Sequence, residues 1–94
     1  MDVEGKTEKR QSFKLTQNRL ENAVTFLLHA DFTDRDWDRL EECYDEQLKR
    51  GYLHFDLDLR SLAYMNSQML GLVVGMNTRI GAGGGYLRLI VAEG

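Results

Sequence analysis

The sequence predicts an α/β fold in which a mixed β-sheet carries helices mainly on one face. Apolar residues alternate with polar ones over residues 13–16 and 53–60, which is typical of strands with one buried face. Residues 34–50 and 67–80 instead have apolar residues at helical spacing, and each of these segments follows a strand-like one. Such alternation implies crossovers between parallel strands, while a pair of strands at the start makes the sheet mixed.

The length of 94 residues allows one small domain with a single core. Residues 1–11 are polar and charged without apolar period, so we expect a flexible N-terminal tail before a domain over residues 12–94. The net charge of -3 argues against nucleic-acid binding, which depends on clustered basic residues. A single cysteine, no signal-like apolar run and no stretch long enough to span a bilayer indicate a cytoplasmic protein that does not insert into membranes.

Two paired strands are expected at the start of the domain. Phe13 and Leu15 alternate with polar residues, and residues 17–22 are rich in turn-forming types. Residues 23–30 are then apolar on both faces except at His29, so this second strand is expected in the centre of the sheet.

A capping pattern marks the first helix. Thr33 is followed three residues later by Asp36, and the sequence continues with apolar residues at helical spacing, namely Trp37, Leu40, Tyr44 and Leu48. These features predict a helix over residues 34–50 that packs on the sheet and ends at Gly51 in a left-handed cap.

The second half of the chain predicts strand, helix and strand. The first strand has Leu53, Phe55, Leu57 and Leu59 on its buried face. The helix begins at Ser67, runs to about Ile80, and carries Met69, Val73, Met76 and Ile80 on one stripe. A glycine-rich turn at residues 81–85 leads to a last strand from Tyr86 to Ala92, with Leu87, Leu89 and Val91 on one face.

The start of the second helix is the main candidate for a functional site. Unpaired N–H groups and the helix dipole favour negative charge there, so phosphate added to Ser67 would be well placed. The simpler interpretation is that Ser67 only caps the helix. Gly71 and Gly75 weaken this helix, and close packing against the sheet, or against a partner helix, would offset that cost.

No catalytic, metal or cofactor site is expected, so the protein is not predicted to be an enzyme. Asp56 and Asp58 share one strand face but lack a third magnesium ligand, and His29 and His54 lack neighbours typical of zinc sites. The glycines at 81–85 follow a helix and precede a strand, the reverse of a phosphate-binding loop.

From Phe13 to Ala92 the chain resembles a STAS domain, the fold of anti-sigma-factor antagonists. In that family a strand ending in Asp-Leu leads to Met-Asp-Ser-x-Gly-Leu-Gly at the head of a helix, and a Gly-Gly pair precedes the next strand. The corresponding elements here are Asp58-Leu59, then Met65-Asn66-Ser67-Gln68-Met69-Leu70-Gly71, then Gly84-Gly85.

The resemblance implies a bacterial regulatory protein-binding module in transcription signalling. The family serine is phosphorylated by a partner kinase of the anti-sigma type and dephosphorylated by a PP2C-like phosphatase; by position it is Ser67. The expected partner-binding residues are Asn66, Ser67, Gln68, Met69 and Gly71. Asn66 replaces the usual acid and Met69 the usual glycine, which implies a divergent partner or no kinase.

Family members usually continue beyond the position of Gly94 with a helix and another strand. We therefore expect an open strand edge and apolar face that a homodimer or a partner protein covers. One alternative function is a structural subunit of a phospholipid-transport ABC system or a stress-sensing complex, without phosphorylation. Another is direct binding of a nucleotide or small ligand, against which the lack of a basic or phosphate-cradling element in the sequence argues.

Overall fold

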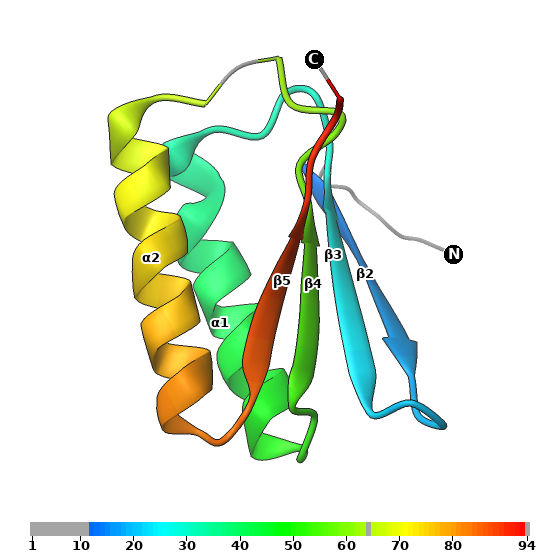
Figure 1. Ribbon diagram of the computed structural model, residues 1–94. Coiled ribbons are helices and arrows are strands. Elements are labelled where there is room, and N and C mark those ends of the chain that lie inside the picture. Colours follow the sequence, from blue (N-terminus) through cyan, green and yellow to red (C-terminus); the bar gives the residue numbers. More distant parts are fainter. Residues whose placement is uncertain (1–11, 64, 94) are drawn as a thin grey trace, which may run out of the picture.

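A four-stranded sheet forms the centre of the computed structural model, which describes residues 12–63 and 65–93 (Figure 1). The strands, in spatial order, are β2 (Phe13–Asn18), β3 (Ala23–Leu28), β4 (His54–Asp58) and β5 (Tyr86–Ile90). β2 is antiparallel to β3, whereas β3 with β4 and β4 with β5 are parallel. This confirms the predicted mixed sheet with the strand at residues 23–30 in a central position. The predicted N-terminal tail lies outside the described residues.

Two helices, α1 (Trp37–Lys49) and α2 (Ser67–Ala82), lie side by side on the same face of the sheet (Figure 1). No helix of the described residues covers the other face. The predicted α/β fold with helices on one face is therefore confirmed. No helix among the described residues has the length and apolar character needed to cross a membrane.

The capping box predicted before α1 is present. The Thr33 hydroxyl accepts a hydrogen bond from the Arg35 N–H at 3.3 Å, and the Asp36 carboxylate accepts one from the Thr33 N–H at 2.9 Å. This first turn is a 3₁₀ helix, η1 (Asp34–Asp36), so the α-helix starts at Trp37 rather than at Asp34. Gly51, with a φ of 97°, terminates the helix region as predicted.

All four strands differ from the prediction at one or both ends. β3 ends at Leu28 rather than at Ala30, and β4 spans His54–Asp58 rather than residues 53–60. Gln17 and Asn18, expected in a turn, extend β2 because they pair with Val24 and Ala23. β5 ends at Ile90 instead of Ala92. Strand ends depend on which partner residues are opposite, a property that local composition does not contain.

The core lies between the sheet and the two helices. Its fully buried side chains come from β3, β4, α1 and α2: Val24, Phe26, Leu28, Leu40, Phe55, Leu57, Met76 and Ile80. Phe26 joins three strands, because its ring centroid lies 6.0 Å from that of Phe13 and 6.4 Å from that of Phe55. The predicted stripe of α2, from Met69 to Ile80, is buried as expected.

The junction between α2 and β5 depends on a glycine. The Gly85 N–H donates to the Ile80 carbonyl at 2.9 Å, and the next N–H, of Tyr86, donates to the Leu53 carbonyl at 2.9 Å. A β-carbon on Gly85 would lie 2.2 Å from the Leu53 carbonyl oxygen. Only glycine therefore fits where the chain enters β5 in this conformation.

Candidate functional site

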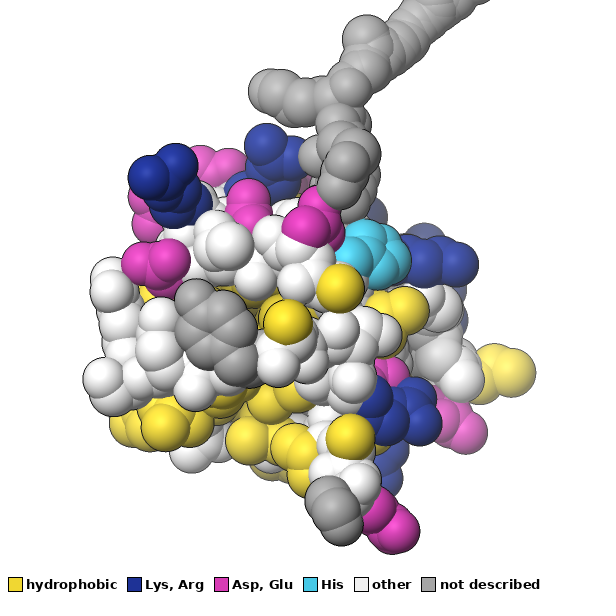
Figure 2. Space-filling view, turned by 90° about the horizontal axis from the view of Figure 1, so that it is seen from above, with side chains coloured by type: hydrophobic (Ala, Val, Ile, Leu, Met, Phe, Trp, Pro, Cys, Tyr) yellow, Lys and Arg dark blue, Asp and Glu magenta, His cyan; other side chains and the backbone are white. Residues whose placement is uncertain are grey.

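The loops that follow β3 and β4 meet at one end of the molecule. Because the two strands are parallel, the connections to α1 and α2 both start at this end, which faces the viewer in Figure 2. They enclose a small cavity of about 80 Å³, lined by Ala30, Phe32, Thr33, Asp34, Ala63, Asn66 and Met69. Ligands of open α/β sheets usually bind at the carboxyl ends of the strands. Ligand pockets typically measure about 300–1,000 Å³, so this cavity does not accommodate a nucleotide.

Asn66, rather than Ser67, caps α2. Its backbone is extended, with φ -99° and ψ 176°, and its Oδ1 accepts a hydrogen bond from the Met69 N–H at 2.8 Å. Ser67 is the first residue of the helix, as predicted, and its side chain is exposed. The interpretation of Ser67 as the helix cap is therefore wrong. The Ser67 hydroxyl has no hydrogen-bond partner among the described residues, and the residue is exposed.

Exchanging Asn66→Ala is expected to lower the free energy of unfolding by about 1 kcal/mol, because the Met69 N–H loses its acceptor. Ser67→Ala is expected to change it by less than about 0.5 kcal/mol, as is usual for surface substitutions. Urea unfolding of the two variants, followed by circular dichroism, measures the difference. A larger loss of unfolding free energy for Ser67→Ala than for Asn66→Ala would show that Ser67 stabilises the start of α2.

Two of the other expected partner-binding residues are exposed, and one is not. Gln68 lies on the surface beside Ser67, and Gly71 is exposed one turn further along α2. The Met69 side chain is only 3% exposed and packs in the core. The assignment of Met69 to a docking surface is therefore wrong, because the same residue begins the buried stripe of the helix.

An open groove runs between α1 and α2. It has a volume of about 560 Å³ and is lined by Trp37, Glu41, Tyr44, Gly71, Leu72, Gly75, Thr78, Arg79 and Ala82. An ion pair between Arg79 and Asp45 connects the two helices. A β-carbon on Gly71 or on Gly75 would meet no atom within 4 Å, so neither glycine packs closely against the sheet. The expected sheet contact is wrong, and both glycines line this groove.

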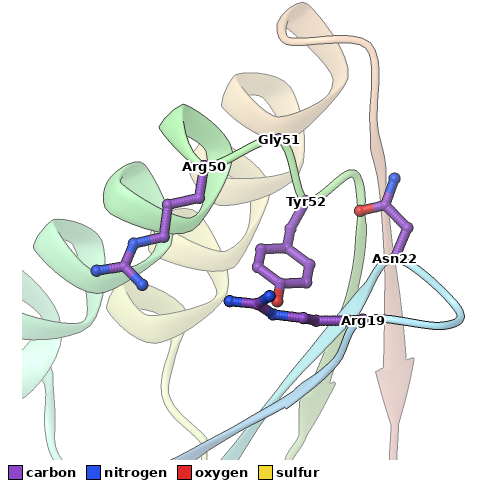
Figure 3. Close-up of a pocket in the computed structure, with 5 residues that line it drawn as sticks. All are labelled: Arg19, Asn22, Arg50, Gly51 and Tyr52. Carbon is purple, nitrogen blue, oxygen red and sulfur yellow. The ribbon is translucent and has the colours of Figure 1, made fainter.

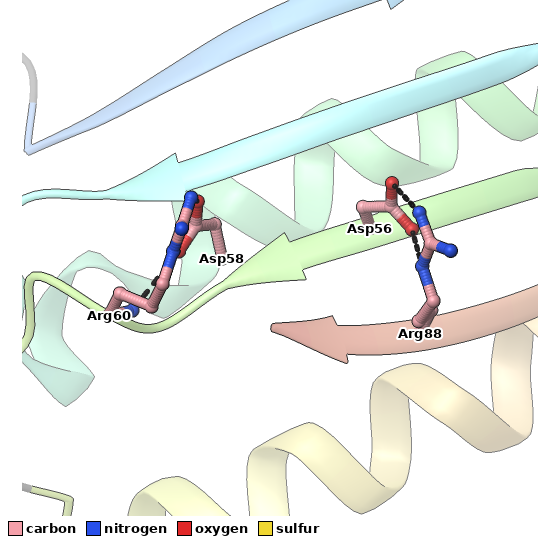
Figure 4. A network of polar contacts seen from close by, with 4 residues as sticks. All are labelled: Asp56, Asp58, Arg60 and Arg88. Atoms are coloured by element: carbon pink, nitrogen blue, oxygen red, sulfur yellow. Dashed lines mark hydrogen bonds and ion pairs between the residues drawn. The ribbon is translucent and has the colours of Figure 1, made fainter. Parts of the chain in front are cut away.

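The acidic pair of β4 is held by arginines on the face that no helix covers (Figure 4). The Asp58 carboxylate accepts hydrogen bonds from Arg60 Nε at 3.0 Å and Nη2 at 2.7 Å, and Asp56 accepts from Arg88 Nε and Nη2, both at 3.0 Å. The hydrogen bonds from Arg60 keep the pKa of Asp58 below its usual value, although burial acts in the opposite direction. Both carboxylates therefore have structural partners, and the described residues contain no cluster of three or more potential metal-ligating side chains.

A second hollow lies at the opposite end of the molecule, where the β2–β3 turn approaches the end of α1 (Figure 3). It is lined by Arg19, Asn22, Arg50, Gly51 and Tyr52 and has a volume of about 560 Å³. Arg50 is paired with Glu46 at 2.9 Å. No sequence pattern indicates this basic hollow, because its two arginines are far apart in the chain and belong to no motif.

The comparison with solved structures finds a similar fold in the NMR structure of the protein TM1081. The superposition has a TM-score of 0.67 at 20% sequence identity and covers 95% of this chain and 70% of that chain. No family model and no curated protein matches the sequence. At this identity the similarity establishes the fold alone.

Proposed function

We propose that this protein is a non-enzymatic, STAS-like regulatory module that binds a protein partner through the start of α2 and is switched by phosphorylation of Ser67. The observation that carries the proposal is the exposed Ser67 hydroxyl at the first position of α2, which is free because Asn66 caps the helix. By the family resemblance, the partner is an anti-sigma factor with serine kinase activity, and a PP2C-like phosphatase removes the phosphate. Such a module acts in the cytoplasm.

A phosphate at Ser67 would change the electrostatics of this surface. It adds close to two negative charges beside the N-terminus of α2, where helix N–H groups stabilise it. Asp34 lies nearby, since it lines the same small cavity as Asn66. A partner with an acidic or apolar contact surface would then be repelled or would have to desolvate the phosphate, and it would dissociate.

The groove between α1 and α2 extends this docking surface. Gly71 and Gly75 each cost the helix about 1 kcal/mol relative to alanine, and a β-carbon at either position would meet no described atom within 4 Å, so close packing within the described residues does not require glycine there. A partner backbone lying in the groove would make use of the absent side chains. Gly75→Ala would then stabilise the isolated protein while weakening the complex, a combination that a purely structural glycine does not produce.

The test is a comparison of partner binding by Ser67 variants. A pull-down from the native cytoplasm with the tagged wild type identifies the bound protein and, by mass spectrometry, the state of Ser67. We expect Ser67→Ala to retain the partner and Ser67→Asp to lose it. Ser61→Asp is the matched control, since it adds the same charge to an exposed serine of the preceding loop. Equal binding by Ser67→Ala and Ser67→Asp would contradict the switch.

One observation favours a second candidate function. Asn66 stands where the family has an acid, and its side chain is engaged in capping. A kinase that reads the acid would not recognise this site. The second candidate is a structural subunit of a phospholipid-transport ABC system or a stress-sensing complex. Recovery of transporter or scaffold proteins, with Ser67 unmodified, would favour it over the switch.

A further inference from the structure

One edge of the sheet is open along β5. Among the described residues, β5 pairs only with β4, so its outer N–H and C=O groups have no strand partner. Exposed edges are usually protected by charged or polar side chains. The opposite edge strand, β2, has exposed Lys14, Thr16 and Gln17, whereas four of the five residues of β5 are Tyr86, Leu87, Leu89 and Ile90.

Apolar side chains continue from this edge onto α2. The register places Leu89 beside Leu57, so Leu89 points to the helix-covered face, yet it is 44% exposed. On α2, Leu70 and Val74 are 54% and 63% exposed, and Val91 beyond β5 is 61% exposed. We call these four residues the β5 flank. Figure 2 shows hydrophobic side chains gathered along the side of the molecule formed by α2 and β5.

Helix geometry places Leu70 and Val74 away from α1. At about 100° per residue, the buried stripe of α2 separates Leu70 and Val74 from Leu72, Gly75 and Arg79, which line the groove toward α1. The β5 flank thus lies across the buried stripe from these three groove residues. Val74 borders the groove on the solvent side of α2, because Gly71 and Thr78 lie one turn away from it. Nothing in the described residues covers the β5 flank.

The β5 flank is also free of net charge. None of its four residues ionises, and the only charged residue of β5, Arg88, is neutralised by Asp56. The exposed side of α1 differs sharply, because it carries Asp38, Arg39, Glu42, Glu46 and Lys49. The four flank residues therefore add no charge to a contact between two copies of a protein with a net charge of -3. A pairing centred on Arg88 brings the two Arg88 side chains opposite each other, and each of them is ion-paired with Asp56 of its own copy.

We propose that a second copy of this chain occupies the β5 flank, with the two β5 strands paired antiparallel about a two-fold axis at Arg88. The sequence of β5 fits such self-pairing, because Leu87 then lies opposite Leu89 of the second copy and Tyr86 lies opposite Ile90. The two-fold axis creates this Leu87–Leu89 pair twice, and both pairs lie on the helix-covered face. The two α2 helices stand on the same face of the joined sheet, where Leu70 and Val74 of each copy approach those of the other.

Light scattering coupled to size exclusion tests this dimer over a range of concentrations. The measured mass of the wild type is expected to rise with concentration, from 10.8 kDa toward twice that value. Leu89→Lys is expected to remain at the monomer mass, because it places a charge opposite Leu87. Leu20→Lys is the matched control, since Leu20 is 99% exposed in the turn between β2 and β3, and β2 is the edge strand opposite β5.

Leu89→Lys could be monomeric only because it fails to fold. Val74→Lys is the second variant, since Val74 is an exposed helix residue outside the sheet and its exchange should not disturb the fold. It is also expected to stay monomeric, with an unchanged circular dichroism spectrum. In a Cys43→Ser background, Arg88→Cys is expected to form a disulfide-linked dimer on oxidation, whereas Thr78→Cys is not. A wild type that is monomeric throughout, a dimer that survives Leu89→Lys, or a different protein bound at the flank would each overturn the proposal.

Discussion

Replacing Gly85 with alanine is expected to lower the free energy of unfolding by about 3 kcal/mol or more, a large share of the stability of a small domain. The new β-carbon would lie 2.2 Å from the Leu53 carbonyl oxygen. That oxygen cannot simply move aside, because it accepts the Tyr86 N–H at the start of β5. Relieving the clash therefore separates the first residues of β5 from β4.

Urea unfolding followed by circular dichroism measures this effect. Gly81→Ala is the matched control: Gly81 lies in α2, and a β-carbon there would meet nothing within 4 Å. We expect this variant to be as stable as the wild type or more stable, because alanine favours helix. Wild-type stability of Gly85→Ala would show that the chain enters β5 by another path.

Truncating Phe26 to alanine is expected to cost about 3–5 kcal/mol, the usual range for a buried phenylalanine. Phe26 is fully buried on the central strand β3, with the ring of Phe13 at one side and that of Phe55 at the other. Its removal leaves a cavity where β2, β3 and β4 are held together. Urea unfolding followed by circular dichroism measures this loss of unfolding free energy.

Leu20→Ala is the control for this core substitution. Leu20 is 99% exposed, so its truncation is expected to change the free energy of unfolding by less than about 0.5 kcal/mol. Similar losses in the two variants would mean that the aromatic contacts across β2, β3 and β4 contribute little.

The fold was predictable because its signals are local. Strict alternation around Phe55 and Leu57 identified β4, and the helical stripe from Met69 to Ile80 identified both α2 and its buried face. The position of Gln17 and Asn18 was missed, because their pairing with β3 is decided by the register of the whole hairpin. The local spacing of apolar residues thus predicted which helices and strands form, whereas pairing between strands determines where the strands end.

The candidate site was predictable only in part. The sequence motif correctly located the start of α2 at Ser67, but whether Asn66 or Ser67 caps it depends on backbone angles that composition does not reveal. In the sequence, Gly71 and Gly75 indicate a weak helix, but they do not indicate which neighbouring element they face. The basic hollow with Arg19 and Arg50 forms only when the β2–β3 turn meets the end of α1, so no local pattern indicates it.

The connections between strands also order the steps of folding. β2 and β3 are joined by a short turn, so this hairpin requires closure of only a small loop. β3 and β4 pair in parallel with all of α1 between them, and their ladder requires a much longer closure before any strand hydrogen bond forms. During refolding, we therefore expect β3 to keep one open edge until α1 has packed and β4 has been added. β3 is thus a central strand in the folded sheet, but an edge strand in the early hairpin that it forms with β2.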